Sequence, residues 1–152
     1  MDYSTVSGGT VNAANGLYST VSGGVCNTAN ADYATIGGGG DEGCIYGNLV
    51  TDNWGTVSGG IGNQAGDNAG DIDDHEFATV GGGYDNISKG SYSMIGGGHF
   101  NTAIGSYSMI GGGYSNIASG SYSMVGGGYG NTASMDYSKV GGGYVNDASG
   151  SY

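Results

Sequence analysis

The 152-residue sequence has little of several residue types that other classes of protein need. It contains no proline, and its only basic residues are Lys89 and Lys139, so that its formal net charge is −11. A nucleic-acid backbone would be repelled by such a chain, which argues against nucleic-acid binding. No stretch approaches the ~18 consecutive apolar residues of a transmembrane helix, so we expect no membrane span.

Large aliphatic side chains are also scarce in this sequence. Leu, Ile, Val and Phe together make up roughly 15% of the chain, a level at which an acidic protein would ordinarily be suspected of disorder. The 37 glycines do not indicate collagen either, since they occur in clusters rather than at every third position and no proline accompanies them. Any order must therefore come from the arrangement of these residues.

That arrangement is a repeat of about 15 residues, and a fixed short period of this kind is typical of solenoids. The segment 92–98 (YSMIGGG) is a clear copy of its opening. The spacing is broken twice, because Trp54 follows Tyr33, and Phe77 follows Trp54, at longer intervals. Position 1 of each copy is aromatic, and Tyr152 opens a further copy. We call the nine aromatic residues at position 1 before Tyr152 the aromatic ladder, and expect it to be an intersubunit or a binding surface: Tyr3, Tyr18, Tyr33, Trp54, Phe77, Tyr92, Tyr107, Tyr122 and Tyr137.

The first four positions of the unit alternate in character and predict a strand. Alternate side chains of a strand point to opposite faces, so positions 2 and 4 should face the interior and positions 1 and 3 the outside. Position 2 is small, and glycines at positions 5 to 7 allow a sharp corner. Position 4 is always Val or Ile, which predicts an internal row: Val6, Val21, Ile36, Val57, Val80, Ile95, Ile110, Val125 and Val140.

A second strand is predicted around position 10, where asparagine recurs, and position 12, which is Ala or Ser88. Stacked asparagines can hydrogen-bond along the solenoid axis and fix the register of the coils. A glycine near position 14, such as Gly105 or Gly120, is expected to make the second corner. We call the row at position 10 the Asn ladder: Asn12, Asn27, Asn63, Asn86, Asn101, Asn116, Asn131 and Asn146.

The sequence thus predicts an all-β fold, a parallel β-roll or β-solenoid with ~15-residue turns. We expect residues 1–152 to form a single repeat domain of about nine turns, as part of a longer fibre, with insertions at about 40–52 and 66–76. One Val, one Ala and one Ser per turn make a thin core, so we expect identical chains to associate and bury the outward rows.

The insertions are the other places where specificity could lie. The second carries five carboxylates that would suit Ca²⁺, from Asp67, Asp71, Asp73, Asp74 and Glu76, although their spacing does not match an EF-hand. A solvated acidic loop is the favoured interpretation, and no other cofactor is expected. The two thiols, Cys26 and Cys44, are interpreted as buried or idle in preference to a disulfide.

The half-motifs at 93–96 (SMIG) and 101–105 (NTAIG) resemble the head repeats of YadA-like trimeric autotransporter adhesins. Similar repeats occur in phage tail fibres. The resemblance implies a left-handed roll, a homotrimer, a location on the outside of a cell, and attachment to a matrix or surface ligand. This unit is longer than the usual one, replaces the second Ser by Asn, and adds tyrosines and a glycine triplet.

We therefore expect a non-enzymatic extracellular fibre protein, an adhesin head or stalk segment that attaches through its aromatic ladder and its loops. A phage tail fibre in a virion and a filament that assembles head to tail are the alternatives. An enzyme is not expected, because repeats present the same side chains on every turn while catalysis needs unlike groups in one pocket. An ice-binding array is disfavoured, since the row of threonines at position 3 gives way to Met94.

Overall fold

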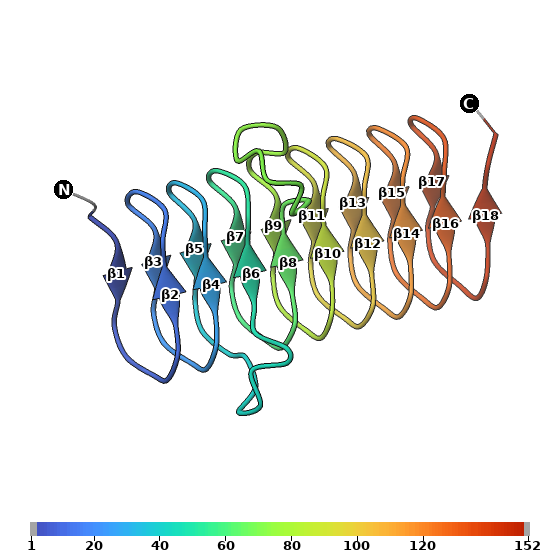
Figure 1. The fold of residues 1–152 in the computed structure, drawn as a ribbon. Helices are drawn as coiled ribbons and strands as arrows, with labels where there is room; N and C mark the ends of the chain where they lie inside the picture. The colour runs from blue at the N-terminus through green and yellow to red at the C-terminus, as the bar shows by residue number, and fades with distance from the viewer. Residues whose placement is uncertain (1–2, 151–152) are drawn as a thin grey trace.

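The computed structural model describes residues 3–150, and the chain in this range winds into a stack of coils with no helix. Each coil contributes one short strand to each of two sheets, and the strands of each sheet follow one another along the axis (Figure 1). The two insertions leave the stack on opposite edges, the first after β5 and the second after β8 (Figure 1). The expected β-solenoid with turns of about 15 residues is confirmed. Tyr152, the expected start of a further copy, lies outside the described residues.

Every strand is two residues long and pairs in parallel with its equivalents in the neighbouring coils. The register joins identical repeat positions, as in Met94↔Met109 and Ile95↔Ile110. The first sheet contains β1 (Thr5–Val6), β3 (Thr20–Val21), β5 (Thr35–Ile36), β7 (Thr56–Val57), β9 (Thr79–Val80), β11 (Met94–Ile95), β13 (Met109–Ile110), β15 (Met124–Val125) and β17 (Lys139–Val140). The second contains β2 (Ala13–Ala14), β4 (Thr28–Ala29), β6 (Leu49–Val50), β8 (Gln64–Ala65), β10 (Ile87–Ser88), β12 (Thr102–Ala103), β14 (Ile117–Ala118), β16 (Thr132–Ala133) and β18 (Asp147–Ala148).

The core is the narrow space between the two sheets, and the predicted Val and Ile row lies in it. Ile36, Ile95 and Ile110 are fully buried, and alanines such as Ala103 face them from the second sheet. Val6 has the predicted position in the row but is 45% exposed, because its strand, β1, lies at the end of the sheet and pairs with β3 alone. Burial of one branched side chain per coil, at about 1.5–3 kcal/mol each, is the main apolar contribution of the repeat.

The Asn ladder is confirmed and carries more hydrogen bonds than a simple stack of amides. Asn116 Nδ2 donates to Asn101 Oδ1 at 3.1 Å and to the carbonyl oxygens of Gly112 and Gly128 at 3.0 Å each. Its Oδ1 accepts from both the backbone amide and the side-chain amide of Asn131. Because the side chain is fully buried, this network satisfies polar groups that water cannot reach.

One detail of the predicted repeat was wrong, and another was incomplete. The aromatic residue at position 1 belongs to a turn rather than to a strand, and it has a left-handed backbone, with φ of 59° at Tyr107. The glycine at position 14 does not supply positive φ; it is small because a Cβ on Gly105 would lie 2.1 Å from the carbonyl oxygen of Gly120. Gly105 thus lies at the second corner as predicted, where its carbonyl oxygen accepts from the Ser108 amide at 3.1 Å, but the left-handed residue of that corner is the aromatic one.

The first insertion is shorter than the predicted 40–52. Asn48 joins the Asn ladder, donating to Asn27 Oδ1 and accepting from Asn63, and Leu49–Val50 forms β6 with Val50 fully buried. The extra residues thus lie before Asn48, between the glycine corner and the second sheet. The sequence pattern concealed this because Leu49 and Val50 replace the usual Thr-Ala pair and were counted with the insertion.

Candidate functional site

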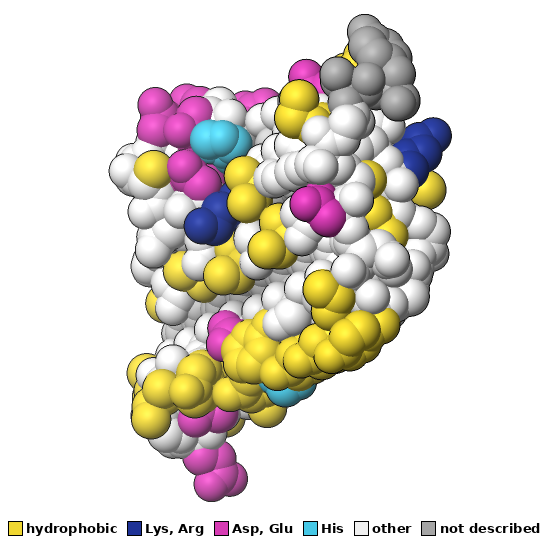
Figure 2. Space-filling model, turned by 90° about the vertical axis from the view of Figure 1, so that its right-hand side faces the viewer, with side chains coloured by type: hydrophobic (Ala, Val, Ile, Leu, Met, Phe, Trp, Pro, Cys, Tyr) yellow, Lys and Arg dark blue, Asp and Glu magenta, His cyan; other side chains and the backbone are white. Residues whose placement is uncertain are grey.

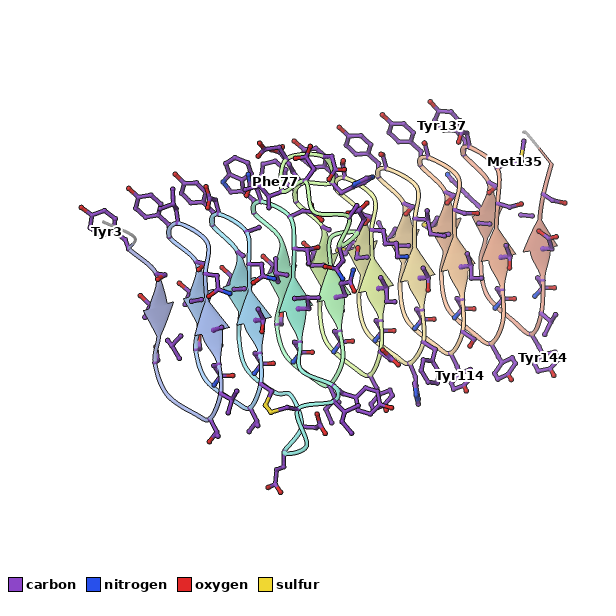
Figure 3. The ribbon with its side chains drawn as sticks, in the orientation of Figure 1. Tyr3, Phe77, Tyr114, Met135, Tyr137 and Tyr144 are labelled. Carbon is purple, nitrogen blue, oxygen red and sulfur yellow. A yellow bond between two sulfur atoms is a disulfide. The ribbon has the colours of Figure 1, made fainter. Side chains whose placement is uncertain are left out.

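The aromatic ladder forms a continuous column of stacked rings along one edge of the solenoid. Consecutive ring centroids from Tyr3 to Tyr137 lie 4.7–5.3 Å apart, and neighbouring ring planes differ by no more than 14°. Tyr3, Phe77 and Tyr137 mark the course of this column in Figure 3. The spacing follows directly from the separation of strands in a sheet, so the column is as rigid as the coils that support it.

The rings of the column are about half exposed, at 48% for Tyr92, Tyr107 and Tyr122. Their faces cover one another, so the exposed parts are ring edges and, at the tyrosines, phenolic hydroxyls. Trp54 and Phe77 interrupt the row of hydroxyls beside the second insertion. The column therefore offers an amphipathic strip suited to an extended partner, and it has no free ring face on which a single planar ligand could stack between two neighbouring coils.

A second group of aromatic residues lies along the opposite edge, at and next to position 8 of the repeat. Tyr114, Tyr129 and Tyr144 stack with centroids 5.1 Å apart, while His99 packs edge-on between Tyr84 and Tyr114. Figure 3 places Tyr114 and Tyr144 on the edge away from Tyr137, and Figure 2 shows a hydrophobic band there. The pKa of the Tyr84 phenol is raised, mainly because the group is partly removed from water and to a smaller extent because of the neighbouring Tyr46.

The outer face of the first sheet changes along the axis as the sequence predicted. Thr79 pairs with Met94, and Met94 with Met109, so a polar row becomes an apolar one at that point. Met94 and Met109 are each 40% exposed. A regular threonine array, which an ice-binding surface would need, is thus confined to the first five coils.

The first insertion is fastened to the coil before it by a disulfide between Cys26 and Cys44, visible at the lower edge of Figure 3. The interpretation of these cysteines as unpaired thiols was wrong. The two residues are 18 apart in sequence, yet their Cα atoms lie 5.2 Å apart, because the insertion folds back against the preceding coil. Sequence distance concealed a proximity that the stacking of coils creates.

The second insertion brings together some of its acidic residues. The carboxylates of Asp67 and Asp74 meet the imidazole of His75, with Nδ1 at 3.4 Å from Asp67 Oδ2 and 3.2 Å from Asp74 Oδ1. These three residues can each direct one ligand atom to a common point. Figure 2 shows acidic side chains gathered beside a histidine on one corner of the molecule.

The other predicted calcium ligands do not belong to this group. Asp73 accepts a short hydrogen bond from the Asn53 side chain, and Asp71 Oδ1 accepts from the amide of Asp73 at 3.1 Å. Glu76 likewise lies outside the three-residue cluster. Two of the five predicted ligands are therefore brought together, along with a histidine that the calcium hypothesis did not include.

A buried carboxylate lies next to this cluster. Asp52 is 1% exposed, and its Oδ2 accepts from the backbone amide of Asp67 at 2.8 Å and from the Thr51 hydroxyl at 3.1 Å. Its Oδ1 is buried with no hydrogen-bond partner among the described residues. Burial, and to a smaller extent the charges of Asp67 and Asp74, raises the pKa of Asp52. Asp52 was missed in the sequence because it lies one coil before the loop that it contacts.

Comparison of the sequence with protein-family models finds no match, and comparison with curated proteins finds none either. Among residues 3–150, no helix is long and apolar enough to cross a membrane.

Proposed function

We propose that this chain is a non-enzymatic segment of an extracellular fibre, an adhesin head or stalk that attaches to a surface through its aromatic ladder and its loops. The observation that carries the proposal is the column of stacked, half-exposed rings along one edge. Side chains that repeat every turn suit an extended contact, whereas catalysis needs unlike groups gathered in one place.

Two further features support an extracellular location and a structural role. A disulfide such as Cys26–Cys44 persists in oxidising surroundings and is rare in the cytosol. The coils are held by parallel backbone pairing and by the buried Asn ladder, which together make a stiff rod. Both features fit the adhesin head that the repeat resembles, and they fit a virion fibre as well.

We also propose that the rod is a homotrimer with left-handed coils. Each coil buries about one branched residue, so association would add the apolar burial that a single thin core lacks. The row of Met94 and Met109 is the surface that three chains would share. Sedimentation equilibrium distinguishes the states, since three chains of 14.9 kDa would give about 45 kDa. A fully folded monomer would contradict the trimer, and an open-ended filament would favour head-to-tail assembly instead.

Attachment can be tested by replacing three rings of the column, Tyr92, Tyr107 and Tyr122, with asparagine. Asparagine tolerates the left-handed backbone at these positions, so the coils should remain folded. We expect the variant to lose binding to matrix-coated plates and to polystyrene beads. The matched control replaces Tyr114, Tyr129 and Tyr144 on the other edge. Undiminished binding by the first variant, with circular dichroism unchanged, would contradict a role for the aromatic ladder.

A further inference from the structure

The second insertion contains three side chains whose ligand atoms converge without making hydrogen bonds to one another. His75 Nδ1 is a buried atom with no hydrogen-bond partner in the described structure, although carboxylate oxygens of Asp67 and Asp74 lie 3.4 and 3.2 Å away. A hydrogen bond needs alignment as well as proximity, and here the alignment is missing. A metal ion between the three groups would engage all of them.

The two distances from His75 Nδ1 to the carboxylate oxygens fit one class of ion. Zinc binds histidine nitrogen and carboxylate oxygen at about 2.0–2.2 Å in tetrahedral geometry, which places neighbouring ligand atoms about 3.4 Å apart. The two measured separations, 3.2 and 3.4 Å, are close to that value. Calcium takes six to eight oxygen ligands at longer range, whereas this cluster offers a nitrogen and two carboxylates.

A second group that has no hydrogen-bond partner in the described part of the chain lies beside the cluster. Asp52 is almost completely buried, and its Oδ1 has no partner within residues 3–150. Its other oxygen holds the backbone amide of Asp67, so this carboxylate lies directly against the residue that opens the cluster. Buried carboxylates are costly unless paired or placed near a cation. A divalent ion at the cluster would offset two of the negative charges that Asp52, Asp67 and Asp74 can carry.

We propose that Asp67, Asp74 and His75 form a binding site for a divalent transition-metal ion of the Zn²⁺ class, with water completing the coordination. The metal would join the start of the insertion, at Asp67, to its end, where His75 lies just before Glu76 and Phe77. The same insertion is tied to the residue before Trp54, because Asn53 donates to the carbonyl oxygen of Ile72 and to the Asp73 carboxylate. Metal binding would therefore fix the surface next to the middle of the aromatic ladder.

Trp54 is the one tryptophan of the chain and provides an intrinsic probe, because it stacks on Phe77 at 5.1 Å. The experiment titrates the full chain with Zn²⁺, and separately with Ca²⁺, and follows both Trp54 emission and binding heat. The protein must be oxidised, so that the Cys26–Cys44 disulfide removes the thiols as competing ligands. We expect one Zn²⁺ per chain and no comparable binding of Ca²⁺.

The variants His75→Gln and Asp74→Asn should each weaken Zn²⁺ binding by roughly tenfold or more, since even outer-shell changes cost that much at metal sites. Asp71→Asn is the matched control, because it removes the same charge from the same loop outside the cluster. His99→Gln controls for the other histidine. Circular dichroism verifies that each variant is folded.

Three results would overturn the proposal. One is the absence of saturable Zn²⁺ binding to the wild type, and another is equal weakening by Asp71→Asn and Asp74→Asn, which would indicate diffuse attraction to an acidic loop. The third is Ca²⁺ binding as tight as Zn²⁺ binding and insensitive to His75→Gln, which would assign the loop to an oxygen-only site.

Discussion

Replacing Asn116 with alanine tests the part of the fold on which register depends. The side chain donates to Asn101, Gly112 and Gly128 and accepts twice from Asn131. Its loss leaves the backbone amide of Asn131 with no other partner in the described structure, and Asn131 is fully buried. The Gly112 carbonyl also loses this bond, although it is partly exposed and water can compensate.

An orphaned buried polar group costs about 1–3 kcal/mol, and each hydrogen bond lost elsewhere about 1 kcal/mol. We therefore expect Asn116→Ala to lower the free energy of unfolding by about 2–4 kcal/mol. Because coils of a solenoid can open separately, urea denaturation followed by far-ultraviolet circular dichroism should be combined with hydrogen exchange at the adjoining coils.

Two further variants show whether the hydrogen bonds are responsible. Asn116→Asp keeps the shape but turns a donor into an oxygen that faces three acceptor oxygens, so it should be less stable than Asn116→Ala at neutral pH. Ser119→Ala lies in the same coil and removes a hydroxyl that makes no side-chain hydrogen bond within the described range, so it should change stability little. A cost below about 0.5 kcal/mol for Asn116→Ala would refute this account of the Asn ladder.

Gly126→Ala should be far more destabilising than Gly141→Ala, because a Cβ at Gly126 would lie 2.4 Å from the carbonyl oxygen of Gly141, whereas a Cβ at Gly141 would meet nothing within 4 Å. Comparable melting temperatures of the two variants would contradict this. Ser123→Ala should be neutral or stabilising, since the buried hydroxyl of Ser123 has no hydrogen-bond partner in residues 3–150. Ser93→Ala should instead lower the free energy of unfolding by about 1 kcal/mol, because it breaks the 2.7 Å hydrogen bond to the Ser88 hydroxyl. Denaturation midpoints compare the two variants, and the opposite order of stability would count against this expectation. Because the pKa of Asp52 is raised in the folded protein, folding favours the protonated carboxyl. The contribution of Asp52 to the free energy of unfolding is therefore present below the pKa of the unfolded chain and is lost as the pH rises through the pKa of the folded protein. Asp52→Asn should remove that loss, which unfolding midpoints between about pH 3 and pH 7 would detect, and an unchanged pH profile would show that Asp52 does not control it.

The periodic pattern was sufficient to predict the solenoid and most of its interior. Repeat positions that recur at a constant interval must stack when the chain coils, so Ile95 necessarily lies between Val80 and Ile110. The same reasoning placed Asn116 between Asn101 and Asn131 and the rings of Tyr92 and Tyr107 in one column. These are consequences of spacing, which the sequence displays directly.

The errors concern residues whose structural role differs from the one that their residue type or local sequence suggests. Tyr107 has a left-handed backbone, a conformation that costs an aromatic residue about 1–2 kcal/mol and that local sequence would have assigned to glycine. The stacked neighbours hold it there. Val50 was counted with the first insertion although it is a core residue, because only stacking on Ala29 and Ala65 identifies it as part of a coil.

What the sequence alone determined is therefore the repeat: the period, the inward and outward rows, and the presence of two interruptions. Only the tertiary structure decided which residues from different coils meet, as in the Cys26–Cys44 disulfide and the contact of Asp52 with Asp67. The physical reason is that regular coils repeat one set of contacts, which a period encodes. An insertion makes contacts once, and their partners are fixed by how the loop folds back onto the stack.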